Sequence, residues 1–210
     1  MTDHSVAKTN RRRRPEARPA EILAAALALF TEKGFSATRM EDISSRAGLS
    51  KAAIYLYFDD KVALLQALVK DTVGNNLALA RGMAKGHEGP IAPLLTTLLR
   101  FIAGRVTGSR LPDMLKLVIS ESRAHPSIGH FYLENIILQG LPFFEGLIRR
   151  GIETGEFRSV DPVFTVRTMV APILLASIWK SVFEPLGGET LDVEGFFDHT
   201  AEFLLRGLRP

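Results

Sequence analysis

The stretch that decides the fold is TRMEDISSRAGLSKAAIYLYF, residues 38–58. Its apolar residues recur at the three- and four-residue spacing of helices, in two short runs that Gly48 separates. Thr38 and Glu41 have the spacing of a capping box, which predicts a second helix with Thr38 at its N-terminus. Ser50 is placed to cap a third helix over about residues 51–57. Two short helices joined by a tight, glycine-containing turn are typical of a helix-turn-helix.

The predicted third helix has two unlike faces. A step of about 100° per residue places Ile54 and Phe58 on the core side and Tyr55 away from it. The two alanines beside Tyr55 allow a close approach to the floor of a DNA major groove, and the tyrosine can touch a base edge or a phosphate. The alternative is an ordinary three-helix core in which the tyrosines only pack.

Phosphate contacts are expected from hydroxyl and ammonium groups around the same turn. A helix N-terminus favours an anion, and lysines near it add charge. The full set of candidate DNA contacts is Thr38, Arg39, Ser50, Lys51, Ala52, Ala53, Tyr55, Leu56, Tyr57 and Lys61.

The rest of the chain predicts helices and no strands, because no segment alternates with period 2 between turn residues. A first helix is expected over about 18–33, and a fourth begins after Asp59-Asp60. Glycines and prolines between Ala80 and Pro93 predict a loop or a break. Later helices are expected at about 92–107, 112–123, 127–150, 161–184 and 193–206, with kinks or splits near Gly140 and Pro142 and at Pro172.

Composition limits the class of protein. The chain has 210 residues, of which 46% are hydrophobic and 23% charged, enough for a core in one long or two short domains. The absence of cysteine excludes disulfides, thiolate zinc sites, iron–sulfur clusters and a cysteine nucleophile. The longest nearly apolar run, residues 169–179, is shorter than the ~20 residues of a membrane span. We therefore expect no transmembrane helix, no secretory signal and a cytoplasmic protein.

Positive charge is concentrated at the N-terminus. Residues 1–20 carry a net charge of +4, with four consecutive arginines at Arg11–Arg14, whereas the whole chain carries +3. A flexible basic arm over 1–17 is expected to add DNA affinity through counterion release. A solvated leader without a role is the alternative.

Residues 22–69 resemble the TetR-type bacterial transcriptional regulators. They have the family's order of an apolar first helix ending in Phe-x-x-x-Gly-Phe, then Ala-Gly-Leu-Ser, then Ile-Tyr-x-Tyr-Phe-x-x-Lys and a Leu-Leu pair. Ala52 stands where glycine is frequent and Ser44 where alanine is frequent. The resemblance implies a homodimer that reads a palindromic operator, usually as a repressor, with Thr38, Lys51, Tyr55, Tyr57 and Lys61 among the DNA contacts.

The expected fold is all-α. A three-helix helix-turn-helix domain over 18–65 is joined by the fourth helix to a helical domain over 66–210. By the same resemblance, the second domain binds a small-molecule effector and dimerises. An apolar or amphipathic ligand is expected in a pocket lined by Phe101, Met114, Leu117, Phe131, Phe143, Phe144, Ile148, Met169 and Trp179, although such a stripe is more often core.

Apolar residues in excess of one buried face predict a two-fold contact between chains. The candidates are Val170, Leu174, Ile178, Phe183, Phe196, Phe197, Phe203 and Leu204. They alternatively close the core of a single chain.

No catalytic, nucleotide-binding or metal-binding motif is present, and the five histidines are scattered. We therefore expect neither an enzyme nor a cofactor or metal. Two alternatives remain open: an all-helical carrier or hydrolase whose first helices do not read DNA, and a DNA-binding regulator without a small-molecule inducer.

Overall fold

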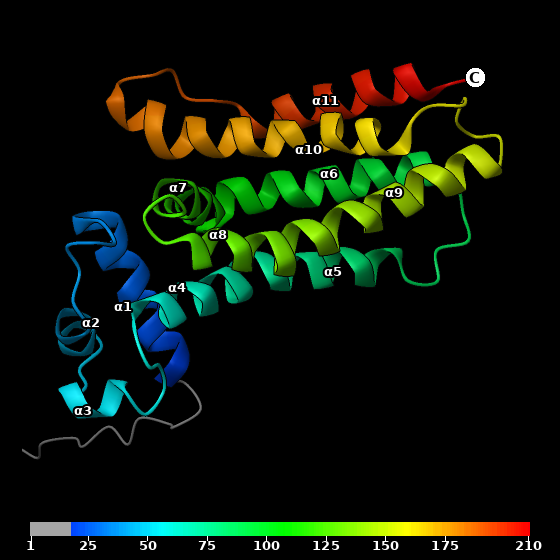
Figure 1. The fold of residues 1–210 in the computed structure, drawn as a ribbon. Coiled ribbons are helices and arrows are strands. Elements are labelled where there is room, and N and C mark those ends of the chain that lie inside the picture. Colours follow the sequence, from blue (N-terminus) through cyan, green and yellow to red (C-terminus); the bar gives the residue numbers. More distant parts are fainter. Residues whose placement is uncertain (1–17) are drawn as a thin grey trace, which may run out of the picture. The chain divides into compact units, whose positions relative to one another are not determined.

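The computed structural model describes residues 18–210, so the predicted basic arm over 1–17 lies outside the described residues. The expected all-α class is confirmed, because residues 18–210 contain no strand. The helices, labelled in Figure 1, are α1 (Arg18–Lys33), α2 (Met40–Arg46), α3 (Lys51–Ile54), α4 (Lys61–Val69), α5 (Asn75–Ala84), α6 (Ile91–Gly108), α7 (Leu111–Glu121), α8 (Pro126–Tyr132), α9 (Leu138–Glu153), α10 (Pro162–Ile178) and α11 (Val193–Leu208). Shorter helical turns are a 3-10 turn at Glu184–Leu186 and π-helical turns at Lys70–Gly74, Leu133–Ile137 and Trp179–Phe183.

The chain divides into two units, the first ending at Lys61 and the second running from Val62 to Pro210. We call them the N-terminal unit and the C-terminal unit and describe each by itself. The N-terminal unit contains α1, α2 and α3, and the C-terminal unit contains all helices from α5 onward.

The core of the N-terminal unit is built from apolar residues at helical spacing. Ile22 and Phe30 on α1, Ile43 on α2 and Ile54 on α3 are buried. The ring of Phe30 lies 4.9 Å from that of Phe35, centroid to centroid. These contacts hold α2 and α3, which are too short to be stable alone, against the longer α1.

A glycine makes the turn between α2 and α3 possible. Gly48 has φ +66°, a conformation that side chains with a Cβ rarely adopt. The amide of Leu49 then donates to the carbonyl of Ser44 at 2.8 Å, which closes the end of α2. Ser50 caps α3 as predicted, because its hydroxyl accepts from the amide of Ala53 at 3.2 Å. The predicted helix-turn-helix is confirmed.

Two local predictions in this region are wrong. Arg39, not Thr38, is the N-cap of α2, and the carboxylate of Asp42 accepts from the Arg39 amide at 3.2 Å. The third helix is also shorter than the predicted 51–57, since α3 ends at Ile54 and residues 55–57 form a tighter turn. Amides in that turn bond to carbonyls three residues back, as Tyr57 does to Ile54 at 3.0 Å.

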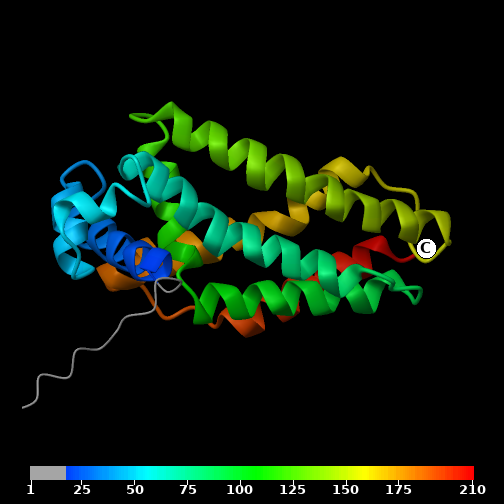
Figure 2. The same cartoon turned by 90° about the horizontal axis from the view of Figure 1, so that it is seen from below.

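The C-terminal unit is a bundle of long helices. Figure 1 shows α6 and α9 between α5 on one side and α10 with α11 on the other, and Figure 2 shows the same helices from below. Helix α6 packs against α11, and α10 packs against α9 and α7. Large buried side chains such as Leu95, Leu98 and Phe197 fill the space between these helices.

The predicted break between Ala80 and Pro93 is too wide. Helix α5 continues to Ala84 and α6 begins at Ile91, so the loop covers only 85–90. A glycine inside a helix costs about 1 kcal/mol relative to alanine, yet α5 continues through Gly82.

The predicted kinks correspond to local changes of helical register. The helix predicted over 127–150 is observed as α8, a π-helical turn and α9, with Pro142 inside α9. In that turn the amide of Leu138 bonds to the carbonyl of Leu133, five residues back. Helix α10 runs through Pro172, and its π-helical turn follows seven residues later at Trp179. Proline cannot donate the i to i−4 bond, yet α10 is continuous across Pro172, so no split occurs at that position.

The segment that follows α9 bonds to the ends of two other helices. Glu156, after α9, accepts from the amides of Ile91 and Ala92 at 2.6 and 2.7 Å and so caps α6. Next to it, the amide of Arg158 donates to the carbonyl of Leu208 at the end of α11. A Cβ on Gly151 would lie 2.2 Å from the ring of Phe157, so only glycine fits there.

The helical stretch Pro162–Leu186 differs from expectation. It spans 25 residues and contains an 18-residue window with a mean hydropathy of 1.5, so it is long and apolar enough by length and composition to cross a membrane. The sequence predicted no membrane-spanning helix, because its longest nearly apolar run, residues 169–179, is shorter than a span. Core helices of soluble proteins can be equally long and apolar, so one such stretch does not indicate a membrane protein. Most of its apolar window is uncovered within a single chain.

Candidate DNA-binding surface and interior pocket

The N-terminal unit exposes large side chains at the end of α3. Leu56 is 83% exposed, and its neighbours Tyr55 and Tyr57 are 43% and 41% exposed. Ala52 is also exposed, whereas Ile54 is fully buried and anchors the turn in the core. The predicted division of this segment into a core face and an outward face is therefore confirmed for Ile54 and Tyr55. An exposed surface of tyrosines, a leucine and a small residue can meet base edges and thymine methyl groups.

Lys51 lies at the start of α3 in an exposed ion pair. Its Nζ lies 2.7 Å from a carboxylate oxygen of Glu41, and both side chains are largely exposed. The hydrogen bond between them raises the pKa of Lys51 and lowers that of Glu41. An exposed pair of this kind contributes little free energy, so a phosphate can replace Glu41 as the partner of Lys51.

Thr38 does not lie on the exposed surface. Its side chain is 1% exposed, and its hydroxyl donates to the carbonyls of Gly34 at 2.8 Å and Leu29 at 3.3 Å. The hydroxyl holds the loop before α2 against the end of α1. The prediction that Thr38 offers a hydroxyl to DNA disagrees with this geometry, because the group is buried and already bonded.

Lys61 is also bonded within the protein. Its Nζ donates to the carbonyls of Phe35, Ser36 and Thr38 at 2.8, 3.0 and 3.2 Å and lies 4.7 Å from the centre of the Phe35 ring. An ammonium group has three hydrogens, so these three bonds use its whole donor capacity. The predicted phosphate contact of Lys61 therefore disagrees with the structure, in which Lys61 supports the loop before α2.

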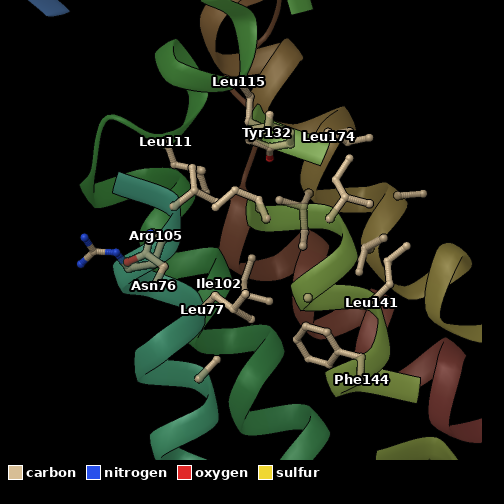
Figure 3. A pocket seen from close by; sticks show the side chains of 18 of the residues that line it. Asn76, Leu77, Ile102, Arg105, Leu111, Leu115, Tyr132, Leu141, Phe144 and Leu174 are labelled. Atoms are coloured by element: carbon tan, nitrogen blue, oxygen red, sulfur yellow. The ribbon is translucent and has the colours of Figure 1, made fainter. Parts of the chain in front are cut away.

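The C-terminal unit encloses an apolar pocket of about 380 Å³. Figure 3 shows its side chains converging from α5, α6, α7, the α8–α9 stretch and α10. The lining residues are Val73, Asn76, Leu77, Ala80, Phe101, Ile102, Arg105, Leu111, Leu115, Tyr132, Ile136, Ile137, Gly140, Leu141, Phe144, Arg167, Val170, Ala171, Ile173 and Leu174.

Of the nine predicted pocket residues, only Phe101 and Phe144 line this cavity. The other seven predictions disagree with the structure for two reasons. Met114, Leu117, Ile148 and Met169 are buried in the packed interior, while Phe131, Phe143 and Trp179 lie outside the cavity lining. The indole of Trp179, for example, donates to the carbonyl of Glu189 at 2.8 Å.

Sequence reasoning missed the contribution of α5 to the pocket. Asn76, Leu77 and Ala80 come from a segment close to the predicted break. The spacing of apolar residues alone could not have identified them, because it does not tell which helices pack together.

Polar side chains are few in the pocket. The side-chain amide nitrogen of Asn76 and the Nε of Arg105 are buried and have no hydrogen-bond partner among the described residues. Burial raises the pKa of Tyr132 from 10.0 to about 12, so its phenol stays protonated well above neutral pH. Figure 3 shows this hydroxyl pointing into the cavity.

The predicted dimer residues have different environments. Phe197 is fully buried in the core of its own chain, so the prediction that it contacts a second chain is wrong. Val170 and Leu174 line the pocket. Phe183 and Phe203 are exposed, and Ile178, Phe196 and Leu204 are half-buried. Three other apolar side chains of Pro162–Leu186 are exposed, although they were not among the predicted dimer contacts: Phe164, Leu175 and Leu186.

Residues 18–210 contain no group of three potential metal-ligating side chains. The geometry thus presents two places for recognition: an exposed turn in the N-terminal unit and an apolar pocket in the C-terminal unit.

Comparisons with known proteins agree with this arrangement. Residues 22–68 match the family model described as "Bacterial regulatory proteins, tetR family". The chain is similar to the HTH-type transcriptional regulator RutR of Escherichia coli K12, with 26% identity across all of both chains. It is also 25% identical to the HTH-type transcriptional repressor KstR2 of Rhodococcus jostii, over 83% of this chain and 84% of that one.

A solved structure shows the same fold. It is the transcriptional regulator FadR of Bacillus subtilis in complex with stearoyl-CoA, with a TM-score of 0.75 and 20% identity over 90% of this chain and 99% of that one. The family model covers the helix-turn-helix described above, and the likeness to RutR extends through the C-terminal unit. The helix-turn-helix of this chain therefore matches the TetR family of bacterial regulatory proteins, and the whole chain is similar in sequence to regulators of the helix-turn-helix type.

Proposed function

We propose that this protein is a homodimeric, sequence-specific transcriptional repressor, and that a small apolar or amphipathic ligand releases it from a palindromic operator. The observation that carries the proposal is the exposed turn Tyr55–Tyr57 on a helix-turn-helix that matches the family model. In this proposal residues 18–65 bind DNA, residues 66–210 bind the ligand and dimerise, and the protein acts in the cytoplasm without enzymatic activity. The name of KstR2 as a repressor supports the direction of regulation.

The DNA contacts divide into two kinds. Tyr55 and Leu56 are the proposed base contacts, because their side chains are exposed and stand beside the small residue Ala52. The proposed contacts to DNA phosphates, which orient the protein on the duplex, are made by Arg39, Ser50, Lys51, Ala53 and Tyr57. Thr38 and Lys61 hold the loop that precedes α2 and so position the turn indirectly.

A second copy of the chain is the proposed cover for the exposed apolar face of α10 and α11. Phe164, Leu175 and Phe203 are each more than half exposed and lie on these two helices. A two-fold contact would bury the same side chains of both chains. Two recognition turns related by this axis then match an inverted repeat in DNA.

The apolar pocket is the proposed effector site. Its volume of about 380 Å³ falls in the range of small-molecule sites, and apolar side chains dominate its lining. FadR, which has the same fold, is described in complex with stearoyl-CoA, so this helical arrangement accommodates an amphipathic ligand in that protein.

Selection of bound duplexes from a random-sequence pool tests this function. The purified full-length protein is expected to enrich an inverted repeat. Fluorescence anisotropy at two salt concentrations should then show binding well above that of a scrambled duplex of equal length. Salt-sensitive binding with no enriched sequence would contradict sequence-specific regulation, and turnover of a small molecule without DNA binding would favour a carrier or hydrolase.

A further inference from the structure

The wall of the apolar pocket contains two polar groups that no other group satisfies. Asn76 lies on α5 and Arg105 on α6, two helices that pack against each other, and both side chains line the cavity. The Asn76 amide nitrogen and the Arg105 Nε are buried without an acceptor among the described residues. Figure 3 shows both residues on the same side of the pocket, with the terminal nitrogens of Arg105 directed away from it.

Unpaired buried donors are uncommon in folded proteins, because each has lost its hydrogen bonds to water. Both groups at this wall are N–H donors, so the missing partner is a hydrogen-bond acceptor. Tyr132 supplies a third donor from α8, since its hydroxyl points into the cavity and its raised pKa keeps the proton in place. A ligand with acceptor atoms at one end would satisfy groups that the protein itself leaves unpaired.

The charged residues that line the pocket also favour an anionic ligand. The lining residues include two arginines, Arg105 and Arg167, and no aspartate or glutamate. Arg167 lies on α10 and is exposed, and it donates to the carbonyl of Val163 one turn earlier. A cation in this cavity would lose its water and find no carboxylate among the lining residues, whereas an anion would meet the unpaired Nε–H of Arg105.

We propose that the effector is an amphipathic anion, with an apolar body in the cavity and a carboxylate or phosphate head against Asn76, Arg105 and Tyr132. This inference rests on the proposed effector site and specifies its ligand class. The aliphatic side chains of the lining hold the body without directional bonds. The polar wall decides the head group, because the unpaired N–H groups of Asn76 and Arg105 need an acceptor, and the Tyr132 hydroxyl can donate to the same kind of group.

Four probes with the same apolar chain test the head group. Decanoate, decyl phosphate, decan-1-ol and decylammonium are titrated separately into the full-length protein, below the concentrations at which they form micelles. Binding is followed by calorimetry and by the fluorescence of Trp179, the single tryptophan of the chain. At least one of the two anions is expected to bind roughly tenfold or more tightly than decan-1-ol, and decylammonium most weakly. The two anions together distinguish a carboxylate site from a phosphate site.

A double variant tests the assignment to these residues. Asn76→Leu with Arg105→Met removes both donors while keeping side chains of similar size. The preference for the anion over decan-1-ol is expected to disappear, while the affinity for decan-1-ol stays within about twofold, which shows that the pocket is still folded. Arg149→Met, on the exposed side of α9, is the matched control and should keep the preference.

Several outcomes would overturn the inference. These are equal binding of anion and alcohol by the wild type, tighter binding of decylammonium, no binding of any probe, or a double variant that retains the preference. The operator titration separates this failure from failure of the proposed function. Operator binding without an anion preference removes only this inference, whereas an anion preference without operator binding removes only the DNA-binding function.

Discussion

The two units of this protein keep their recognition groups in opposite places. In the N-terminal unit, Leu56 and the two tyrosines beside it are held out at the surface. In the C-terminal unit, the unpaired donors of Asn76 and Arg105 are buried beside a cavity. Exposed groups suit a large rigid partner that cannot enter a protein, and enclosed groups suit a small ligand that can. The same kind of element, the α-helix, therefore serves two kinds of recognition according to which side chains it buries.

The contacts that support the two sites also differ, in how far apart in the sequence the bonded residues lie. The exposed turn is held by contacts within the N-terminal unit, such as those of Thr38 and Lys61 with the loop before α2. The bundle around the pocket depends on contacts between distant segments, such as Glu156 with the start of α6, 65 and 64 positions away. Substitutions in one unit should therefore leave the function of the other unchanged unless the two are coupled through a ligand.

The largest expected effect is on DNA binding. Tyr55→Ala removes an exposed side chain proposed to touch a base, so operator affinity should fall by about 1–3 kcal/mol, roughly five- to 150-fold. Anisotropy with the selected operator measures this loss, and circular dichroism checks the fold. Tyr132→Phe in the other unit is the control and should bind the ligand-free operator like the wild type. An unchanged affinity for Tyr55→Ala would remove this residue from the base contacts.

A smaller effect is expected on the stability of the C-terminal unit. Glu156→Ala leaves the amides of Ile91 and Ala92 without their acceptor, which should lower the free energy of unfolding by about 1–2 kcal/mol. Urea denaturation followed by the fluorescence of Trp179 measures it. Glu153→Ala, an exposed residue of α9, is the matched control. Equal midpoints for the two variants would show that the cap contributes nothing.

Lysines 51 and 61 should differ in their effect on salt dependence. Lys51→Met should lower the slope of log affinity against log salt by about one, because an exposed ammonium is lost from the phosphate contact. Lys61→Met should leave the slope unchanged and lower the thermal midpoint, since its ammonium is bonded to three carbonyls. A slope lowered by Lys61→Met would show that Lys61 leaves those carbonyls and meets a phosphate, as the sequence had predicted.

The smallest effect concerns alkaline pH. The pKa of Tyr132 is raised to about 12 in the folded protein, while an unfolded tyrosine titrates near 10.0. Between these values the unfolded chain loses the proton and the folded chain keeps it, so unfolding becomes more favourable as pH rises. At pH 11 the loss should be about 1 kcal/mol.

Tyr132→Phe should lack this part of the alkaline loss. Urea denaturation at pH 8 and pH 11 compares the wild type with Tyr132→Phe, and Tyr57→Phe serves as the exposed control. Identical losses of stability in all three proteins would contradict the burial of the Tyr132 phenol.

Prediction succeeded where neighbours in sequence decide the structure. The ends of α1 and the cap of α3 follow from Pro19, Gly34 and Ser50, because helix caps act within one turn. The burial of Ile54 and the exposure of Tyr55 follow from helical spacing against a single core. It failed at Thr38, where capping by the threonine and capping by Arg39 with Asp42 are both compatible with the local pattern. Burial of the Thr38 hydroxyl against the end of α1 decides between them.

Prediction of the pocket failed for a different reason. Met114, Ile148 and Phe144 have the same apolar character in the sequence, yet only Phe144 lines the cavity. Which face of a helix meets a neighbouring helix, and which meets a gap, depends on how several helices pack. Lys61 shows the same limit in the N-terminal unit, since its three acceptors lie 23 to 26 positions away.

The sequence by itself determined the all-helical class, the position of the helix-turn-helix and the outward side of its third helix. These features depend on spacing, capping and glycine conformation over a few residues. Only the tertiary structure decided that Thr38 and Lys61 are supports, that α5 lines the pocket and that Asn76 and Arg105 lack acceptors. Such features depend on contacts between segments far apart in the chain, and local patterns of hydrophobic and polar residues do not specify those contacts.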